Sequence, residues 1–477
     1  MVKYVLFRLL SVLGELMLLP LIVALIYREF NCALAFLAIF VACVVVGVIG
    51  ARKPPMDTVI FAREGFAITA VAWIGMSLVG AIPFFVTGAI PNYIDALFET
   101  VSGFTTTGGS ILTTVAGMPK SVQFWRTFTH WIGGMGVLVF LIAVVPMADG
   151  YSMHLMRAES PGPTVGKIVP KVKDTAKILY LIYIAITLAE MVALKISGLS
   201  LYESITISFS TVGTGGFAVT DTGIGGYSMA TQNIIIVFMA LCGVNFTVYY
   251  YLIKKKPKEA FAIEEVKCYF VVMVLAAVFI SINIFKAGIT AGFGEAFHHS
   301  LFAVVSIMTT TGFGTLDFNL WPTFSKILLM GLALVGACAG STGGGFKYSR
   351  ALIACRNARN ELNFLVHPKA VKRVYMDGHT VSGTTVKSVS AYLGLYVITL
   401  LASVFFVSFD DFGFETTVTS VIATMNNIGP GLDMIGPMGN YSQFSYFSKI
   451  VLMFDMLAGR LELLPIFIVV KLKTWKN

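Results

Sequence analysis

Long apolar runs separated by short polar segments dominate the hydropathy pattern of the chain. A helix needs about 20 predominantly apolar residues to cross the hydrocarbon core of a membrane, and about ten runs approach or exceed that length. They cover residues 4–27, 32–50, 66–87, 123–148, 177–197, 230–253, 268–287, 325–346, 388–408 and 447–470. The pattern therefore predicts an all-α integral membrane protein. The first run follows basic residues, as the apolar part of a signal peptide does. It is longer than the apolar part of a signal peptide, and a second run follows it directly, so we expect a helix that stays in the mature protein.

Shorter apolar segments lie between the later runs, and each leads into hydroxyl or amide residues followed by glycine. These segments are residues 96–109, 201–215, 300–313 and 414–431. At roughly 15 residues they are too short to cross a membrane. The first and third align without gaps, with T-T-T-G at 105–108 matching T-T-T-G at 309–312. The second and fourth keep the pattern as S-T-V-G at 210–213 and N-N-I-G at 426–429.

This internal repeat predicts two N-terminal helices followed by four helix, pore loop, helix units around a single pore. The expected boundaries are 1–50 for the N-terminal pair and 51–150, 151–256, 257–375 and 376–477 for the four repeats. A helix that stops inside the membrane leaves irregular backbone at depth, which is tolerated only where it is buried in protein or lines a water-filled cavity. Four carbonyl-rich segments, each shaped by a glycine, can replace the hydration shell of a monovalent cation. One such peptide would be an ordinary loop, but four in register favour four re-entrant pore segments.

Composition and charge agree with a membrane protein and exclude several other classes. The 477 residues are 57% hydrophobic and 12% charged with a mean hydropathy of +0.83, which leaves too little polar surface for a soluble globule. The net charge of +9 follows from topology, because most of the 34 Lys and Arg residues fall in cytoplasmic segments if both termini are cytoplasmic. No nucleic-acid partner is needed to explain it. The basic segments 150–176 and 348–386 are suited to contact anionic membrane lipid, and neither is long enough to be a nucleotide-binding domain.

The sequence offers little support for a metal site, a nucleotide site or a catalytic site. The six cysteines are scattered without a C-x-x-C pair, and the adjacent His298 and His299 lack a third ligand at a useful spacing. The peptide G-S-T-G-G-G-F-K at 340–347 resembles a phosphate-binding loop, but Phe346 displaces the lysine and no buried strand precedes it. An intramembrane enzyme is therefore the weaker alternative to a pore.

The three consecutive glycines in that peptide predict a break in the second helix of the third repeat. Each glycine costs about 1 kcal/mol relative to alanine inside a helix. A break in a pore-lining helix favours a movable constriction, and the alternative is close helix packing at the G-x-x-x-G spacing of Gly336 and Gly340. An unbroken helix would carry Lys347 to the inner surface, so its depth depends on this break.

Arg460 falls near the middle of the last apolar run. A guanidinium there costs at least about 2.5 to 3.5 kcal/mol unless it is paired or faces water. We therefore expect it to face the pore or an acid, and Asp455 and Glu462 are the nearest acids in sequence. A cation below a cation filter would be a barrier to permeation; a salt bridge between helices is the alternative.

Acidic residues gather on the predicted outer side, where their summed field could concentrate cations at a pore mouth. They are Asp95, Glu99, Asp221, Asp317, Asp410, Asp411 and Asp433. Ordinary solvated loop acids are the alternative for each of them.

Specific peptides strengthen the repeat pattern. They are W-R-T-F-T-H-W-I-G-G-M-G at 125–136, G-A-C-A-G-S-T-G-G-G-F-K at 336–347, N-N-I-G-P-G at 426–431 and D-M-L-A-G-R-L-E at 455–462. With these peptides the chain resembles the membrane subunit of Trk-type potassium uptake systems, in the superfamily that includes Ktr and plant HKT proteins. The resemblance covers essentially all 477 residues.

The resemblance implies which residues bind and gate the ion. The expected filter residues are Thr106, Thr107, Gly108, Thr211, Val212, Gly213, Thr310, Thr311, Gly312, Asn427, Ile428 and Gly429. Serine at the first filter glycine accompanies sodium preference in HKT relatives, so Gly108 favours potassium. The expected gate lies below the filter and comprises Gly340, Ser341, Thr342, Gly343, Gly344, Gly345 and Lys347. Arg460 is expected to face the pore.

The resemblance also implies the function and the partners. We expect a homodimer in the bacterial inner membrane that takes up potassium and binds no cofactor of its own. A separate cytosolic subunit that binds NAD or ATP is expected to regulate it. Coupling to protons or sodium is the alternative, although Glu15, Glu190 and Asp455 are few acids for a relay.

Overall fold

A computed structural model describes residues 2–53, 62–136, 172–369, 373–463 and 466–467. The chain begins with three helices, α1 (Val2–Leu16), α2 (Leu18–Ile26) and α3 (Phe30–Gly50). α1 and α2 together form the first predicted span and are interrupted at Met17. Pro20 explains the interruption, because it has no amide hydrogen to donate to the preceding turn.

Four long helices then open the four predicted repeats. They are α4 (Ala62–Val86), α9 (Val172–Ile196), α14 (Glu264–Lys286) and α18 (Gly383–Val407). Each exposes large aliphatic side chains along one face, such as Ile398 and Leu401 of α18, as expected for contact with lipid tails. Within the described residues six helices are long and apolar enough to span a membrane, or seven if the bent pair described below is one span.

Each long helix is followed by a shorter one, which we call a half-helix. The half-helices are α5 (Tyr93–Phe104), α10 (Leu201–Val212), α15 (Phe293–Met308) and α19 (Phe414–Met425). At about 1.5 Å per residue they are too short to cross a bilayer, as the sequence predicts. α5 begins where the Asn92 side chain accepts the Ile94 amide at 2.8 Å, and α10 begins at a capping box of Ser200 and Glu203.

A second short helix completes each repeat. These helices are α6 (Lys120–Gly134), α11 (Met229–Cys242), α16 (Thr323–Val335) and α20 (Tyr446–Arg460). Continuous spans over 230–253, 325–346 and 447–470 were therefore wrong, whereas the end of the span predicted over 123–148 lies outside the described residues. After α11 the chain bends by 95° into α12 (Thr247–Ile253).

Glycines let two of these helices contact a half-helix closely and mark the end of a third. α6 and α20 pass so close to a half-helix that a Cβ at Gly133 would overlap the carbonyl oxygen of Phe104, and one at Gly459 that of Met425. α16 ends at Gly336, whose φ of +74° suits glycine best. Glycine therefore allows α6 and α20 to pack closely on the half-helices α5 and α19.

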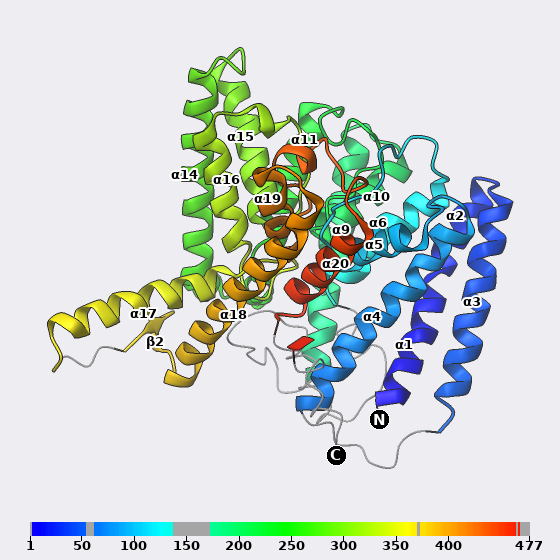
Figure 1. The fold of residues 1–477 in the computed structure, drawn as a ribbon, viewed down its shortest axis with the longest axis horizontal. Helices are drawn as coiled ribbons and strands as arrows, with labels where there is room; N and C mark the ends of the chain where they lie inside the picture. Colours follow the sequence, from blue (N-terminus) through cyan, green and yellow to red (C-terminus); the bar gives the residue numbers. More distant parts are fainter. Residues whose placement is uncertain (1, 54–61, 137–171, 370–372, 464–465, 468–477) are drawn as a thin grey trace.

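The remaining elements lie at the two ends of the bundle. They are α13 (Pro257–Ala262), α17 (Tyr348–Val366), the antiparallel hairpin β1 (Tyr375–Met376) and β2 (His379–Thr380), and the 3₁₀ turns η1 (Phe318–Leu320), η2 (Ser408–Asp410) and η3 (Asp433–Ile435). Figure 1 shows α17 and the hairpin extending from the body on the side where α1 begins. We expect this side to be cytoplasmic.

The core surrounds the half-helices, with α1 and α3 on one flank and α14 and α16 on the other (Figure 1). Two large apolar clusters fill it, one around Trp73 and Trp125 and the other around Tyr269 and Phe302. A buried threonine at the end of each half-helix donates its hydroxyl group to a carbonyl one turn back, as Thr211 does to Ile207 at 2.9 Å. Polar half-helix ends are therefore held at the centre of an apolar body.

Candidate ion-conduction site

Each half-helix ends in a four-residue turn with the same backbone conformation. We call these glycine turns; they are residues 105–108, 213–216, 309–312 and 426–429. The second residue of each turn is left-handed: Thr106 (φ 56°), Thr214 (54°), Thr310 (58°) and Asn427 (54°). The fourth is a left-handed glycine: Gly108 (77°), Gly216 (79°), Gly312 (84°) and Gly429 (93°). In every turn the amide of the third residue donates to the carbonyl of the residue five positions earlier, at 2.8 or 2.9 Å. This bond gives a partner to a carbonyl at the C-terminal end of the half-helix that has none within the helix.

The second glycine turn corrects the predicted alignment of the repeats. Gly213 has a helical φ of −69° and caps α10, so it matches Thr105 in the first repeat and not Gly108. Thr211 and Val212 lie inside α10, and the residue equivalent to Gly108 is Gly216. The alignment of the S-T-V-G peptide was three residues early. Aligning G-T-G-G-F at 213–217 with T-T-T-G-F at 309–313 through the shared glycine and phenylalanine would have found the correct register.

The four glycine turns form a closed ring. The fourth residue of each turn is a glycine that lies against the next turn along the chain. If this glycine carried a Cβ atom, the atom would overlap the carbonyl oxygen of the third residue of that next turn. The pairs are Gly108 with Gly215, Gly216 with Thr311, Gly312 with Ile428, and Gly429 with Thr107. The fourth turn thus meets the first, so the alternation of glycine and carbonyl closes on itself.

A vestibule with a volume of about 160 Å³ opens on one side of this ring. All four fourth-position glycines line it, together with the segments that follow each turn. Asp221 and Arg126 are charged residues in its wall. Asp221 accepts the Val115 amide at 2.6 Å and the Ala116 amide at 3.3 Å, and these bonds lower the pKa of its carboxyl group, so it stays ionised at the mouth.

Most of the other predicted outer acids serve the local structure. Asp95 pairs with Lys449 at 2.7 Å and Glu99 pairs with Arg126 at 2.6 Å. Asp317 and Asp410 accept backbone amides, and Asp433 accepts the Thr416 hydroxyl group. These contacts favour the structural alternative over a ring of free acids.

The predicted helix break is a loop of residues 336–347, which we call the triple-glycine loop. α16 stops at Val335 and α17 begins at Tyr348. The Lys347 amide donates to the Val335 carbonyl at 2.8 Å, which closes the neck of the loop. Lys347 is buried and its ammonium group donates to the Gly343 carbonyl, so its side chain folds back into the loop.

The triple-glycine loop packs directly against the glycine turns. The Gly344 amide donates to the Thr310 hydroxyl at 2.6 Å, and a Cβ at Gly344 would overlap the Asn426 carbonyl oxygen. The Thr342 hydroxyl donates to the Cys242 carbonyl at 3.2 Å. The loop therefore contacts the second, third and fourth repeats, on the side of the ring where the second helices end.

Arg460 connects this loop to the first repeat. Its guanidinium donates to the Thr342 carbonyl at 2.8 Å and to the carbonyls of Gly133 and Gly134 at 2.5 and 2.7 Å. The two acids nearest in sequence bind elsewhere, since Glu462 pairs with Arg350 at 2.5 Å and Asp455 accepts the Ser403 hydroxyl at 2.6 Å.

Sequence reasoning missed Glu265, at the start of α14. Its buried carboxylate accepts the amide of Ala339 at 2.6 Å and that of Ser349 at 3.0 Å. One side chain thus holds the triple-glycine loop and the beginning of α17. Nothing in the sequence relates Glu265 to residues more than seventy positions away, so only the fold could reveal this contact.

Comparison with known proteins assigns the architecture. The family model described as "Cation transport protein", TrkH, matches residues 33–475. The "Trk system potassium uptake protein TrkH" of Salmonella typhimurium is 34% identical over 97% of this chain and 96% of its own length, and that of Escherichia coli is 33% identical with the same coverage. The crystal structure of the potassium transporter TrkH from Vibrio parahaemolyticus superposes with a TM-score of 0.89 at 30% identity, covering 100% of this chain and 99% of that one.

These matches extend over nearly the whole chain, so they include the half-helices, the glycine turns and the triple-glycine loop together. Within the described residues no group of three metal-ligating side chains accompanies them. The apolar helices and the family match agree on a multi-pass membrane protein. This chain belongs to the TrkH family of cation transport proteins.

Proposed function

We propose that this protein takes up potassium across the bacterial inner membrane, as the ion-translocating subunit of a Trk-type system. The closed ring of glycine turns carries the proposal, because it gathers backbone carbonyls from four repeats around one centre. The relatives named as potassium uptake proteins support the choice of ion.

The filter follows from the chemistry of the ring. Carbonyl oxygens can replace the hydration shell of potassium, and each half-helix adds the partial negative charge of its C-terminal end. The proposed filter residues are Thr106, Thr107, Gly108, Thr214, Gly215, Gly216, Thr310, Thr311, Gly312, Asn427, Ile428 and Gly429. Glycine at position 108 keeps the potassium preference expected from the HKT comparison.

The gate is the triple-glycine loop below this ring. Its contacts with Thr310 and Asn426 place it against the turns, so an ion leaving the filter requires the loop to move. Arg460 opposes permeation in two ways: it holds the loop to α6, and it adds a positive charge on the ion path.

Replacing Thr310 with valine is expected to raise passive potassium flux several-fold. Valine keeps the shape of the side chain but cannot accept the Gly344 amide, so the closed loop loses one hydrogen bond worth about 1 kcal/mol. Flux into liposomes measures the effect. Thr424→Val is the matched control, because the Thr424 hydroxyl donates to the Ser420 carbonyl within α19. Equal flux from both variants and the unchanged protein would show that this bond does not hold the gate.

The proposal includes the topology of the chain, its oligomeric state and its regulatory partner. Both termini are cytoplasmic, two copies of the chain form a homodimer, and the repeats keep their expected boundaries, 51–150, 151–256, 257–375 and 376–477. A cytosolic subunit that binds NAD or ATP regulates the pore from the side of α17 and the hairpin. α17 is suited to this role because it continues directly from the triple-glycine loop.

Potassium flux into liposomes that contain only this protein tests the function. A potassium gradient without a proton gradient is expected to drive uptake, and excess sodium is expected not to abolish it. Uptake that begins only with a proton or sodium gradient would favour coupled transport instead. Glu190 and Asp455 would then be the first acids to replace, since both are buried, whereas Glu15 is exposed on α1.

A further inference from the structure

In the first repeat a buried ion pair occupies two positions at which the other three repeats have uncharged residues. The Arg126 Nε atom lies 2.6 Å from a carboxylate oxygen of Glu99, and the side chains are 4% and 0% exposed. Arg126 is seven residues after Pro119, which caps α6, and the same position in the other second helices is occupied by Ile235, Leu329 and Leu452. The positions equivalent to Glu99 are occupied by Ile207, Ala303 and Ser420. Buried aliphatic and small residues therefore suffice for the packing at this depth.

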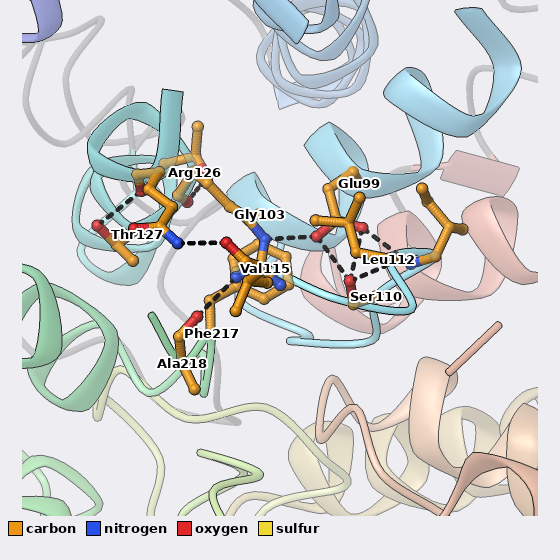
Figure 2. Close-up of polar contacts among 12 residues, drawn as sticks. Glu99, Gly103, Ser110, Leu112, Val115, Arg126, Thr127, Phe217 and Ala218 are labelled. Atoms are coloured by element: carbon orange, nitrogen blue, oxygen red, sulfur yellow. Dashed lines mark hydrogen bonds and ion pairs between the residues drawn. The ribbon is translucent and has the colours of Figure 1, made fainter. Parts of the chain in front are cut away.

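Glu99 holds the segment that leaves the first glycine turn. Its carboxylate accepts the Ser110 hydroxyl at 2.9 and 3.1 Å and the Ile111 amide at 2.9 Å (Figure 2). Ser110 is two residues beyond Gly108. The carboxylate thus fixes the path of the chain just outside the turn.

Arg126 holds the segment that leaves the second glycine turn. Its guanidinium donates to the Ala218 carbonyl at 3.0 Å, and its central carbon lies 3.5 Å from the centre of the Phe217 ring (Figure 2). His130, one helical turn further along α6, packs on the same ring at 4.1 Å. Phe217 directly follows Gly216, so α6 of the first repeat positions the exit of the second turn.

We propose that the Glu99–Arg126 pair is a brace that sets the spacing of the first and second glycine turns and thereby the discrimination of potassium from sodium. The inference rests on the proposed potassium pore. The planar guanidinium can meet a carboxylate, a carbonyl and a ring at once, which an aliphatic side chain cannot do. Without the brace, the first and second turns are still joined by the close contact of Gly108 with Gly215 and by the bonds of Asp221 to residues 114–116. The chain just after each turn is then held less firmly, so the ring adapts more easily to the smaller ion.

The double variant Glu99→Ala with Arg126→Leu tests the brace. It gives the first repeat the Ala303 and Leu329 pair of the third repeat, and removing both charges avoids leaving one of them buried alone. Potassium flux with sodium in competition, or reversal potentials, gives the permeability ratio of the two ions, which does not depend on how much protein has assembled. We expect the permeability ratio of potassium to sodium to fall by about tenfold, because interaction energies between residues in contact are large enough to produce such a change. An unchanged ratio would overturn the proposal.

A second ion pair provides the matched control. Lys449 and Asp95 pair at 2.7 Å with side chains 4% and 22% exposed, and they join α20 to α5. The Lys449 ammonium group also donates to the Ser442 carbonyl at 3.0 Å, which lies well beyond the fourth turn in the chain. Asp95→Ala with Lys449→Leu is expected to keep the wild-type ratio; an equal fall in this control would overturn the assignment to Glu99 and Arg126.

A conservative variant covers the case in which the first double variant does not assemble. Arg126→Lys keeps the charge opposite Glu99 but loses the planar fork, so a lower ratio in assembled protein is expected, and a wild-type ratio would overturn the proposal. Wild-type protein without potassium-selective flux would instead reject the pore itself.

Discussion

Protein carrying Gly216→Ala is expected to lose selective potassium uptake, whereas protein carrying Gly117→Ala is expected to keep it. Both glycines are left-handed, with φ of 79° and 83°, so alanine brings a similar backbone strain of about 1 to 2 kcal/mol at either position. Only at Gly216 would the added Cβ also overlap the Thr311 carbonyl oxygen, since the space around Gly117 is open. The substitution therefore displaces a carbonyl of the proposed filter.

Uptake of potassium against competing sodium, measured in liposomes at matched protein content, distinguishes the two variants. We expect the flux ratio of the two ions to fall by at least about tenfold for Gly216→Ala, because a change of about 1.4 kcal/mol at the filter suffices for that. Normal selectivity in this variant would show that the ring of glycine turns is not the filter. The same experiment tests the corrected register of the second repeat, because Gly216 was not among the filter residues expected from the sequence.

Neutralising Arg460 is expected to have the largest effect on rate. Arg460→Gln removes a positive charge from the proposed ion path and weakens the hold of the triple-glycine loop on α6. Lowering a barrier by about 1.4 kcal/mol raises a rate tenfold, so we expect passive potassium flux to rise by about that factor or more. The permeability ratio of potassium to sodium should change little, since the carbonyls that Arg460 binds, those of Thr342, Gly133 and Gly134, are not among the proposed filter carbonyls.

Arg356→Gln is the control for this experiment. Arg356 also forms an ion pair, with Glu264 at 2.6 Å, but it lies on α17 and is partly exposed. Equal flux from Arg460→Gln and unchanged protein would support the alternative that Arg460 only ties helices together. A gain of flux in both variants would point to a general loosening of the fold.

The sequence was most informative where a pattern is local. Hydropathy and the repeated threonine and glycine peptides predicted the long helices, the half-helices and three of the four turns, because periodicity and residue type decide these elements directly. The second turn was misplaced because residues 210–212 are the last residues of α10 and Gly213 caps that helix, so the left-handed glycine comes three residues later, at Gly216.

Features set by distant contacts could not be predicted. The close approach of α6 and α20 to half-helix carbonyls, at Gly133 and Gly459, is one such feature, and no hydropathy pattern reports it. Arg460 was expected near Asp455 or Glu462, the acids closest in sequence, but those acids bind Ser403 and Arg350. Burial of a charged group could be inferred from sequence, whereas the identity of its partners required the fold.

The closed ring of glycine turns has a consequence for how such a pore can change. In a pore built from four identical subunits every substitution appears four times, so a change at the filter is all or nothing. Here one chain supplies four unequal quadrants, with asparagine at position 427 where the other turns have threonine and a charged brace beside only two of them. A single substitution alters one quarter of the ion's surroundings, and ion preference can therefore be adjusted in small steps.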